Sequence, residues 1–424
     1  MPRKRPSSCS AAEAVPAAFV AAWNARPPDP FVLAVSGGSD SVALLRLVTE
    51  TGAAPPVVTV DHGLRPESTE EAAWVGRLCR DLGLEHHVLR WREAAAGNLQ
   101  AAARNARYRL IGDWARPRGV VTVVTGHTLD DQAETVLMRL ARGSGLDGLA
   151  AMRPRARHEG IAVYRPLLGL RRDALRKHLR SLGQDWLDDP SNDDRRFDRV
   201  KAREALAHLA VLGLTAERLA RTADHMARAR DALEATLDGW TTANMALRPT
   251  GEVSVVRSAY RALPEELRLR LLTRALGLVA GRLYRPRFDA LAPLAARIAE
   301  GGECAQSLHG CLVRADADSV RVFREPGAVA GPEPIVAGAA TWDGRWRVTA
   351  GDPAAEGLSV AALGERGLAL IDPAATGAEW QAAPRLARLT APGVWAGDRL
   401  VAAPLAGCPA GAGWRAALLP PRRC

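Results

Sequence analysis

The sequence predicts an α/β fold built on a doubly wound parallel sheet, followed by a helical second domain and a small mixed C-terminal domain. Two observations carry this expectation. In the first 190 residues, short runs rich in β-branched residues alternate with helical stretches, which is the pattern of βαβ units. A polar, glycine-rich loop separates the first such run from the helix after it. In open α/β sheets, ligands bind at the carboxyl ends of the strands, where this loop is expected to lie.

Five strands and five main helices are expected in this first part of the chain, from its runs of apolar residues and their periodicity. The expected strands are Phe31–Val35, Val57–Val60, His86–Leu89, Val120–Thr125 and Ile161–Tyr164. The expected helices are Asp40–Glu50, Glu67–Leu82, Leu99–Ala115, Asp130–Arg142 and Arg171–Leu182. A short leading helix precedes them. We do not interpret that segment as a secretion signal, because Glu13 and Pro16 interrupt its apolar part.

Beyond residue 205 the pattern changes, and two further domains are expected. Residues 206–325 are predicted to be mainly helical, and residues 326–424 to form a small domain rich in glycine and proline. Helices are expected at 206–237, Pro264–Val279 and Arg287–Glu300, a lone strand at Glu252–Arg257 and a hairpin at 301–325. A linker is expected at Pro326–Ala340, with short strands near Trp342–Val348 and Leu368–Ile371.

The charge of the chain favours a polyanionic partner. Its 424 residues carry 57 basic and 47 acidic side chains, a net charge of +10. Only three of the basic residues are lysines, a bias typical of GC-rich coding. The excess is concentrated in residues 153–180, which hold nine basic and two acidic residues. This local excess of positive charge favours a surface that contacts nucleic acid. The alternative is that these side chains form a solvated helix face.

The cysteines and the hydropathy exclude several classes of protein. The six cysteines include no CxxC pair and no regular spacing, which argues against a disulfide framework and against a zinc or iron–sulfur site. Cys304 and Cys311 are expected to pack in a core. No apolar run approaches the roughly 20 residues of a membrane span. We therefore expect a cytoplasmic protein without a membrane segment.

The loop after the first expected strand carries the strongest indication of function. It consists of Ser36, Gly37, Gly38, Ser39, Asp40 and Ser41. Glycines let the backbone approach an anion, and the helix start offers unpaired N–H groups. The loop lacks the lysine of a Walker motif, and Asp40 would repel phosphate unless a cation lay between them. Asp40 therefore suggests Mg²⁺ held against a nucleotide, with a polar capping turn as the alternative.

A second candidate group follows the fourth expected strand, where the chain reads GHTLDDQAET from Gly126. Thr128 is expected to cap the next helix. Helical spacing places His127 near Asp131, and Asp131 and Asp130 near Glu134. Such carboxylates suit metal binding or removal of a proton from an amine. The alternative is that they only complement the helix dipole.

Three further groups carry weaker indications. Asp61 ends the second strand, where a carboxylate can reach a ribose or a base or belong to an ordinary βα turn. Arg104 and Arg107 lie three residues apart on one expected helix, and they suit either phosphate binding or a solvated face. From the basic segment, the candidates for nucleic-acid contact are Arg153, Arg165, Arg171 and Arg172.

Seven motifs occur in the order found in one known family. They are SGGSDS, VDHGLRPES, AARNARY, GHTLDDQAET, RLARGSGLDGL, YRPLL and WLDDPSNDDRRFDR. From Val32 to Arg203 the chain thus resembles the bacterial tRNA(Ile)-lysidine synthetases, members of the N-type ATP pyrophosphatases, whose sheet is of the adenine nucleotide α-hydrolase-like type. The sequence departs from the family at Arg199-Val200, where the family has an arginine–asparagine pair.

The resemblance implies an ATP-dependent ligase that acts on tRNA(Ile) with a CAU anticodon. C2 of the wobble cytidine is adenylated with loss of pyrophosphate, and the ε-amine of free lysine then displaces AMP. The resemblance implies that Ser36 to Ser41 bind the ATP phosphates and that Asp40 helps to hold Mg²⁺. From their positions in the sequence, Asp61 is a further candidate for ATP and Asp131 for the metal. The implied catalytic residues are Asp40, Arg104, Arg107, His127, Asp131 and Glu134. A homodimer is also expected.

Three alternatives remain open from the sequence. A tRNA thiolase of the same fold would normally need paired cysteines, and Cys79 stands alone in the expected helix–strand part. An amidating enzyme of GMP or NAD synthesis would leave the basic segment unused. A non-catalytic RNA-binding module would have no need of a carboxylate within the phosphate loop.

Overall fold

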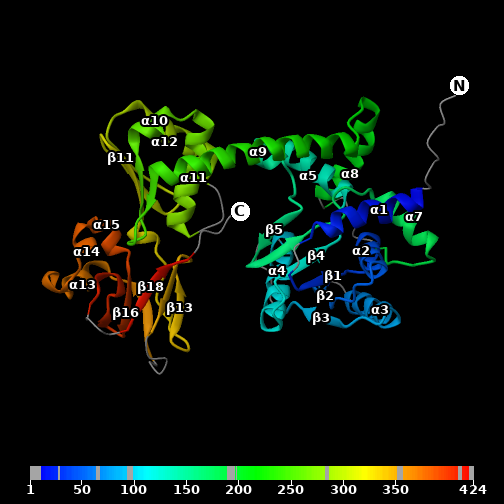
Figure 1. Cartoon of the computed structure of the whole chain (residues 1–424), viewed down its shortest axis with the longest axis horizontal. Helices are drawn as coiled ribbons and strands as arrows, with labels where there is room; N and C mark the ends of the chain where they lie inside the picture. Colours follow the sequence, from blue (N-terminus) through cyan, green and yellow to red (C-terminus); the bar gives the residue numbers. More distant parts are fainter. Residues whose placement is uncertain are drawn as a thin grey trace. The chain divides into compact units, whose positions relative to one another are not determined.

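A computed structural model of the chain describes residues 11–26, 29–63, 67–92, 99–188, 196, 198–281, 286–350, 357–408 and 413–419. Parts of two motifs, at 64–66 and 189–195, lie outside the described residues. The chain divides into two compact units, Met1–Asp231 and Ala232–Cys424 (Figure 1). The division into three domains at 205 and 325 stays a prediction. Among the described helices, none is long and apolar enough to cross a membrane.

The first unit contains a six-stranded sheet with the order β3-β2-β1-β4-β6-β5. Its strands are β1 (Phe31–Ala34), β2 (Val57–Asp61), β3 (His86–Arg90), β4 (Thr122–Thr125), β5 (Arg155–His158) and β6 (Ile161–Tyr164). All neighbours are parallel except β5, which pairs antiparallel with β6. The predicted fold class is confirmed. Strand β5 was not predicted, because its sequence RARH has the polar composition of a loop.

The strand order reverses at β1. The chain adds β2 and β3 on one side of β1 and then returns to place β4 on the other side. In such sheets the crevice between the two oppositely directed connections is the usual ligand site. Ala34 at the end of β1 is in register with Thr125 at the end of β4. The two loops with candidate residues therefore start side by side.

Helices cover both faces of this sheet, and alternate strand residues face each layer. Leu33 packs with the core formed with α1 (Ala11–Asn24), α2 (Ser39–Glu50), α3 (Ser68–Asp81) and α7 (Arg172–Ser181). Val32 packs on the other face with Tyr108 and Ile111 of α4 (Leu99–Ala115). The leading helix that the sequence predicted is α1. This alternation fixes the register of β1 and so the position of the loop after it.

A further layer of helices leads away from β4. These are α5 (Leu129–Ala141), α6 (Leu146–Leu149), α8 (Asp198–Leu209) and α9 (Ala216–Asn244). Ala133 and Val136 of α5 pack with Leu219 and Ala223 of α9. This apolar face of α5 turns its carboxylates toward the sheet crevice.

The second unit begins with a five-stranded antiparallel sheet of order β7-β8-β11-β10-β9. Its strands are β7 (Met245–Leu247), β8 (Val253–Val256), β9 (Cys304–Leu308), β10 (Cys311–Ala315) and β11 (Ser319–Arg324). Its helices are α10 (Arg257–Ala262), α11 (Glu265–Ala280) and α12 (Phe288–Glu300). Cys311 lies in the core and Cys304 packs against it, as expected.

The last part of the chain holds two small sheets, of order β12-β15-β16-β17 and β13-β14-β18. The strands are β12 (Glu333–Pro334), β13 (Ala339–Trp342), β14 (Trp346–Thr349), β15 (Ser359–Ala362), β16 (Pro392–Ala396), β17 (Arg399–Ala402) and β18 (Arg415–Leu418). The helices are α13 (Gly364–Ala369), α14 (Ala378–Ala382) and α15 (Arg385–Leu389). Two expectations were wrong. Leu368 belongs to α13 instead of a strand, and the supposed linker contains β12 and the start of β13.

A buried ion triad joins the five-stranded sheet to the β13–β14 turn. Arg324 at the end of β11 donates from Nη2 to Oδ1 of Asp343 over 2.8 Å. Arg345 donates from Nε to Oδ2 of the same carboxylate over 3.0 Å and from Nη1 to the carbonyl of Gly251 over 3.1 Å. All three charged side chains are at most 4% exposed. The triad therefore couples segments that are far apart in the sequence.

Candidate active site

The loop between β1 and α2 has the shape of an anion cradle. Gly37 has a φ of +92°, and a Cβ there would lie 2.7 Å from Cδ1 of Leu187, so only glycine fits. Gly38 is the N-cap of α2 and offers no side-chain cap. Ser41 Oγ donates to the Gly38 carbonyl over 2.9 Å and accepts from Ser36 N over 3.2 Å. Because the first N–H groups of a helix lack acceptors within the helix, the start of α2 could bind an anion.

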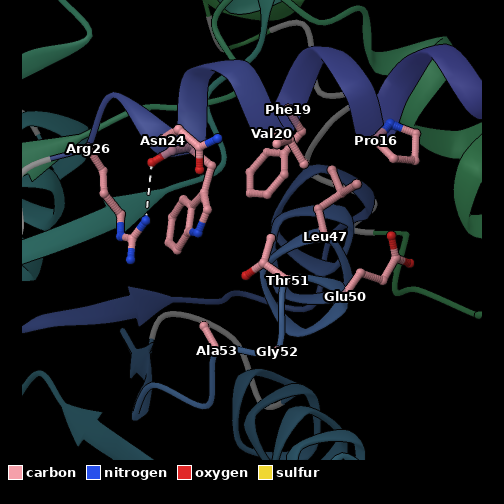
Figure 2. A pocket seen from close by; sticks show the side chains of 11 residues that line it. Pro16, Phe19, Val20, Asn24, Arg26, Leu47, Glu50, Thr51, Gly52 and Ala53 are labelled. Atoms are coloured by element: carbon pink, nitrogen blue, oxygen red, sulfur yellow. Dashed lines mark hydrogen bonds between the residues drawn. The ribbon is translucent and has the colours of Figure 1, made fainter.

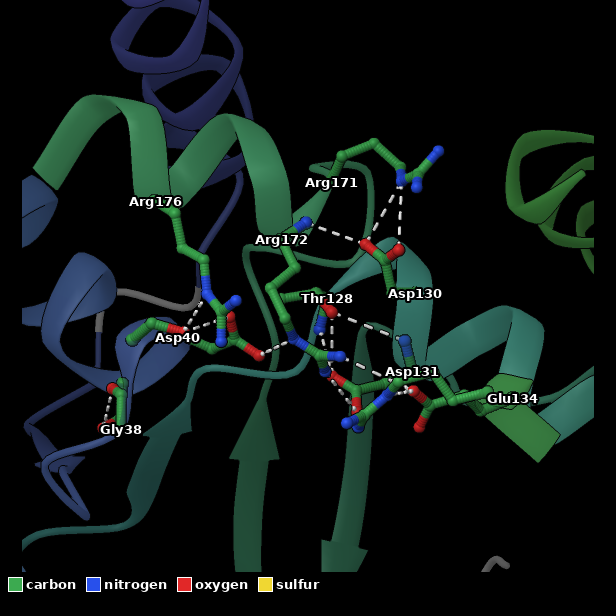
Figure 3. A network of polar contacts seen from close by, with 12 residues as sticks. Gly38, Asp40, Thr128, Asp130, Asp131, Glu134, Arg171, Arg172 and Arg176 are labelled. Carbon is green, nitrogen blue, oxygen red and sulfur yellow. Dashed lines mark hydrogen bonds and ion pairs between the residues drawn. The ribbon is translucent and has the colours of Figure 1, made fainter. Parts of the chain in front are cut away.

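Helix α7 and the segment after it hold this loop through three contacts. The Leu187 amide donates to the Gly37 carbonyl over 2.9 Å. Arg176 Nε donates to Ser39 Oγ over 3.1 Å, and Arg172 Nε donates to Asp40 Oδ2 over 2.8 Å. The two arginines are four residues apart and therefore share one face of α7 (Figure 3). Helix α7 and the segment after it thus hold the loop at Gly37, Ser39 and Asp40.

The start of α5 fixes the position of Asp131. Thr128 donates from its amide and from Oγ1 to Asp131 Oδ2, over 2.8 and 2.9 Å, and Asp131 N donates back to Thr128 Oγ1 over 3.4 Å. This is a capping box, and it confirms the predicted N-cap. Since Oδ2 is used at the cap, Oδ1 faces the crevice, 3.4 Å from Arg172 Nη2 and 3.9 Å from Arg199 Nη1.

Three predicted carboxylates meet at the guanidinium of Arg172 (Figure 3). Besides Asp40 and Asp131, Glu134 Oε1 lies 3.5 Å from Arg172 Nη1 and 3.1 Å from Arg203 Nε. Glu134 is 1% exposed. Its Oε2 is buried and has no hydrogen-bond partner among the described residues. The structure therefore brings together Asp40 of α2 with Asp131 and Glu134 of α5.

The environments of these carboxylates separate their proton affinities. Burial raises the pKa of Glu134, and the neighbouring Asp131 adds to this rise. Burial also raises the pKa of Asp40, although Arg172 acts in the opposite direction. For Asp131 burial is outweighed by Arg172 and Arg199, which hold its pKa below the ordinary value. Carboxyl groups whose pKa values are driven apart are typical of acid–base pairs.

His127 and Asp130 take different roles. Burial lowers the pKa of His127 to about 3, so its imidazole is neutral, and its Nδ1 lies 2.9 Å from Thr125 Oγ1. Helical spacing alone suggested that Asp130 faces Glu134, but the structure shows other partners for Asp130. Its carboxylate accepts hydrogen bonds from Arg171 Nε over 3.1 Å and from the Arg172 amide over 2.7 Å. Asp130 therefore ties α5 to the start of α7.

Asp61 lies at the end of β2 and holds its own turn. Its Oδ1 accepts from the Gly63 amide over 2.9 Å and from Ser68 Oγ over 2.6 Å, and its Oδ2 accepts from Thr69 Oγ1 over 3.2 Å. These bonds lower its pKa, with the Ser68 bond as the largest cause. A contact between Asp61 and ATP stays a prediction.

Arg104 and Arg107 lie on α4. The Arg104 guanidinium is 5.6 Å from the ring centre of Tyr108, and it contributes to the low pKa of His127. Arg107 Nη2 lies 3.3 Å from Nε2 of His62, whose pKa burial lowers to about 4. Arg104 is thus near His127, whereas Arg107 reaches toward the end of β2. Their contact with phosphate stays a prediction.

The four arginines predicted to contact nucleic acid have intramolecular partners. Arg153 Nη2 lies 3.7 Å from Asp231 Oδ1, and Arg171 pairs with Asp130 and Glu217. Arg165 is 3% exposed and donates to the Arg153 carbonyl over 2.8 Å. Arg172 is in the carboxylate cluster. Their contact with RNA stays a prediction.

Three residues of this site were not predicted from the sequence. These are Arg176, Leu187 and Arg203, which contact Ser39, Gly37 and Glu134. One signal was available, because Arg172 and Arg176 lie at helical spacing on an amphipathic segment after a strand. For Arg203 the four-residue spacing from Arg199 is a comparable signal. Leu187 bears no chemical group that would single it out.

The donor set fits Mg²⁺. Among the described residues, no group of three or more His, Cys, Asp or Glu side chains is placed to hold a metal ion. Mg²⁺ is usually bound through one or two carboxylates together with substrate phosphates and water. Asp40 beside the phosphate loop and Asp131 across the crevice provide two such carboxylates.

A separate pocket of about 570 Å³ lies between α1 and the C-terminal end of α2 (Figure 2). Phe19, Leu47 and Glu50 are among its lining residues. The cradle lies at the opposite end of α2, so this pocket is not the candidate active site.

Comparisons with known proteins show what the chain is similar to. Residues 13–210 match the family model of the PP-loop domain. The chain is 45% identical over 409 residues to the tRNA(Ile)-lysidine synthase of Ruegeria pomeroyi, covering 94% of this chain and 93% of that protein. It is 44% identical over 321 residues to the same enzyme of a Bradyrhizobium species, covering 69% of this chain and 89% of that protein. A solved structure, the U34-tRNA thiolase NcsA of Methanococcus maripaludis, shows a TM-score of 0.43 and 15% identity over 50% of this chain and 78% of its own.

Proposed function

The chain belongs to the tRNA(Ile)-lysidine synthase family, and from this premise we propose how its residues carry out the reaction. It is an ATP-dependent ligase that modifies tRNA(Ile). The substrates that we propose are ATP, free L-lysine and the tRNA with a CAU anticodon. The C2 oxygen of the wobble cytidine attacks the α-phosphate and pyrophosphate leaves. The lysine ε-amine then attacks C2, and AMP leaves with the C2 oxygen.

One observation supports this proposal above the others. Carboxylates from the phosphate loop and from α5 meet at one guanidinium, with Arg172 within 3.5 Å of Asp40, Asp131 and Glu134. ATP phosphates bound at Ser36 to Ser41 would therefore lie beside groups that can bind a second, cationic substrate. Mg²⁺ held by Asp40 and Asp131 would neutralise phosphate charge during adenylation.

The lysine step needs an acceptor for a proton. A lysine amine has an ordinary pKa of about 10.4 and arrives as an ammonium. We assign its attraction to Asp131, whose low pKa keeps it ionised, and the acceptance of its proton to Glu134. A raised pKa makes Glu134 the stronger base of the two. The proton would leave the amine as nitrogen attacks C2.

The remaining candidate residues are assigned to the nucleotide and the tRNA. His127, which is neutral, can exchange hydrogen bonds without adding charge near the adenylate. Arg104 and Arg107 would contact phosphate of ATP or of the adenylate. Arg153, Arg165, Arg171 and Arg172 would contribute positive potential toward the tRNA backbone. Asp61 would reach the ribose or base of ATP.

The thiolase alternative has less support. Cys79 is the single cysteine among the described residues of the first unit, and it is buried. Burial raises its pKa to about 11, which keeps the thiol protonated and unreactive. We further propose that the enzyme acts in the cytoplasm and as a homodimer. Size-exclusion chromatography with light scattering tests the dimer, which a monomeric mass would exclude.

The decisive experiment combines the purified full chain, ATP, radiolabelled lysine and a tRNA(Ile) transcript with a CAU anticodon. Label is expected in the tRNA, together with release of AMP and pyrophosphate. A transcript whose wobble base is changed to uridine serves as the control and should remain unlabelled. Absence of label in the CAU transcript would contradict the proposal, and sulfur transfer from cysteine would favour the thiolase.

A further inference from the structure

Arg172 takes the position that the proposed cations need. Its guanidinium lies 2.8 Å from Oδ2 of Asp40, 3.4 Å from Oδ1 of Asp131 and 3.5 Å from Oε1 of Glu134. For Asp131 this is the oxygen left available, because Oδ2 is used at the helix cap. A metal ion at Asp40 and Asp131, or an ammonium at Asp131 and Glu134, must compete with this guanidinium.

Burial makes the guanidinium necessary when no substrate is bound. The side chains of Asp40, Asp131 and Glu134 are 19%, 10% and 1% exposed, and that of Arg172 is 16% exposed. Three carboxylates this close together repel one another strongly where water is scarce. Among the described residues, Arg172 is the one cation within 4 Å of all three. The Glu134 Oε2 atom, which is buried and unpartnered, shows that the cluster retains capacity for another donor.

The guanidinium also has an alternative acceptor close by. The backbone of Arg172 stays anchored, because its amide donates to Asp130 over 2.7 Å. Its side chain already reaches Asp40 at the edge of the loop formed by Ser36 to Ser41. Phosphate oxygens in that loop would offer a guanidinium the paired, charge-assisted hydrogen bonds that it forms best. Release from the carboxylates therefore does not require movement of α7.

We propose that Arg172 is a positioning residue, an internal counter-ion that assembles Asp40, Asp131 and Glu134 before substrates bind and yields their oxygens to incoming cations. This inference rests on the proposed function of the site. It predicts that the ligand-free protein binds divalent metal weakly because Arg172 competes for the ligands. Nucleotide phosphates would relieve this competition by drawing the guanidinium away.

The test is metal binding by the full-length protein in the absence of nucleotide, lysine and tRNA. Titration calorimetry with MnCl₂ at constant ionic strength compares the wild type with Arg172→Gln. The variant is expected to bind Mn²⁺ at least tenfold more tightly, since a neutral amide no longer competes. Affinity equal to or weaker than that of the wild type would overturn the proposal. A residue with only a structural role would not increase metal affinity when removed.

Three further variants define the cause. Arg176→Gln removes the same charge from the same face of α7 but leaves the three carboxylates paired, so its affinity should stay within threefold of the wild type. Arg172→Lys keeps the charge and should also stay within threefold. The double variant Asp40→Asn, Arg172→Gln should not show the tighter Mn²⁺ binding, because one of the metal ligands is removed. If Arg176→Gln increased the affinity for Mn²⁺ as much as Arg172→Gln, the increase would come from the loss of any nearby positive charge. That result would overturn the assignment to Arg172.

A second measurement covers the case in which Arg172→Gln folds poorly without metal. The midpoint of thermal unfolding is then followed against MgCl₂ for both proteins. Mg²⁺ should raise the midpoint of the variant more than that of the wild type, and equal shifts would overturn the proposal. The lysine-incorporation assay on the wild type tests the proposed function separately. The proposed function and the counter-ion role of Arg172 can therefore fail independently.

Discussion

Thr128 and Asp131 hold each other at the start of α5, and this exchange determines which Asp131 oxygen is available to substrates. The threonine donates twice to Oδ2, so Oδ1 alone faces Arg172 and Arg199. The same hydrogen bonds begin a helix and orient a candidate catalytic group. Stability and activity are therefore expected to change together when this pair is altered.

Replacement of Thr128 by valine should affect both properties. The shape is retained, but the hydroxyl that donates to Asp131 and accepts from its amide is removed. Loss of an N-cap costs about 1–2 kcal/mol of unfolding free energy, which urea denaturation measures. Lysine incorporation should fall at least tenfold because Asp131 is no longer fixed. Thr128→Ser keeps the hydroxyl and should restore most of both quantities; no recovery would contradict the capping role.

Asp40→Asn should abolish ATP-dependent lysine incorporation and leave tRNA binding within twofold of the wild type. The amide removes the negative charge that would bind Mg²⁺, whereas Asp40 is not among the residues proposed to contact tRNA. Pyrophosphate release and filter binding of labelled tRNA measure the two quantities separately. Full activity in this variant would remove Asp40 from the metal site.

Gly126→Ala should displace the phosphate loop. A Cβ at Gly126 would lie 2.8 Å from the backbone oxygen of Asp40 and 3.1 Å from Cα of Ser41. Backbone atoms cannot move aside as a flexible side chain can. We therefore expect the free energy of unfolding to fall by about 1–3 kcal/mol and ATP binding to become roughly tenfold weaker. Gly169→Ala is the matched control, since nothing lies within 4 Å of its Cβ. Normal ATP affinity in Gly126→Ala would refute the close approach.

Arg157 and Lys177 provide a test of the basic segment that does not involve the carboxylates. Both are exposed, whereas Arg171 and Arg172 are paired with acids. Neutralising each to glutamine should weaken tRNA binding and reduce the slope of log K against log salt by about 1 for each phosphate that is no longer neutralised. Arg116→Gln removes an exposed charge elsewhere and is the control. An unchanged slope of log K against log salt would show that the segment is an ordinary solvated surface and does not contact tRNA.

Stability should decrease as the pH falls through the range below 6.5. Burial lowers the pKa of His127 to about 3 and those of His62 and His158 to about 4. Between pH 6.5 and about 4 the unfolded chain takes up protons that the folded chain does not, and this favours unfolding. Urea denaturation from pH 7 to 4.5 measures the slope.

His127→Gln isolates one of these histidines from the carboxylates that titrate in the same range. The slope of unfolding free energy against pH reports how many more protons the unfolded chain binds than the folded chain. In this variant that number should be smaller by up to one. An identical slope in both proteins would show that His127 does not retain a low pKa.

The sequence predicted the location of the site better than its internal contacts. Motifs after β1 and β4 could be assigned to one crevice, because parallel strands end on the same edge and the strand order reverses at β1. Thr128 could be predicted as a cap because the helix pattern starts there. The strand pattern, the loop composition and the helix start are local properties of the chain, so they can be inferred from a single sequence.

The partners of the arginines could not be predicted in the same way. Whether Arg172 faces solvent or a carboxylate depends on how α7 packs beside α2, which no local pattern specifies. Arg165 also lies in this strongly basic segment but is buried, with its side chain bonded to the Arg153 carbonyl. Strand β5 was missed because its pairing with β6, and not its composition, makes it a strand.

The triad of Arg324, Asp343 and Arg345 has a consequence for how the second unit comes apart. Removing either side of a buried ion pair leaves a charge without compensation, at a cost of about 3–5 kcal/mol. The helix-covered sheet and the two terminal sheets should accordingly melt in a single cooperative transition. A protease that cuts the chain between the five-stranded sheet and the two terminal sheets is therefore expected to leave two fragments that stay associated.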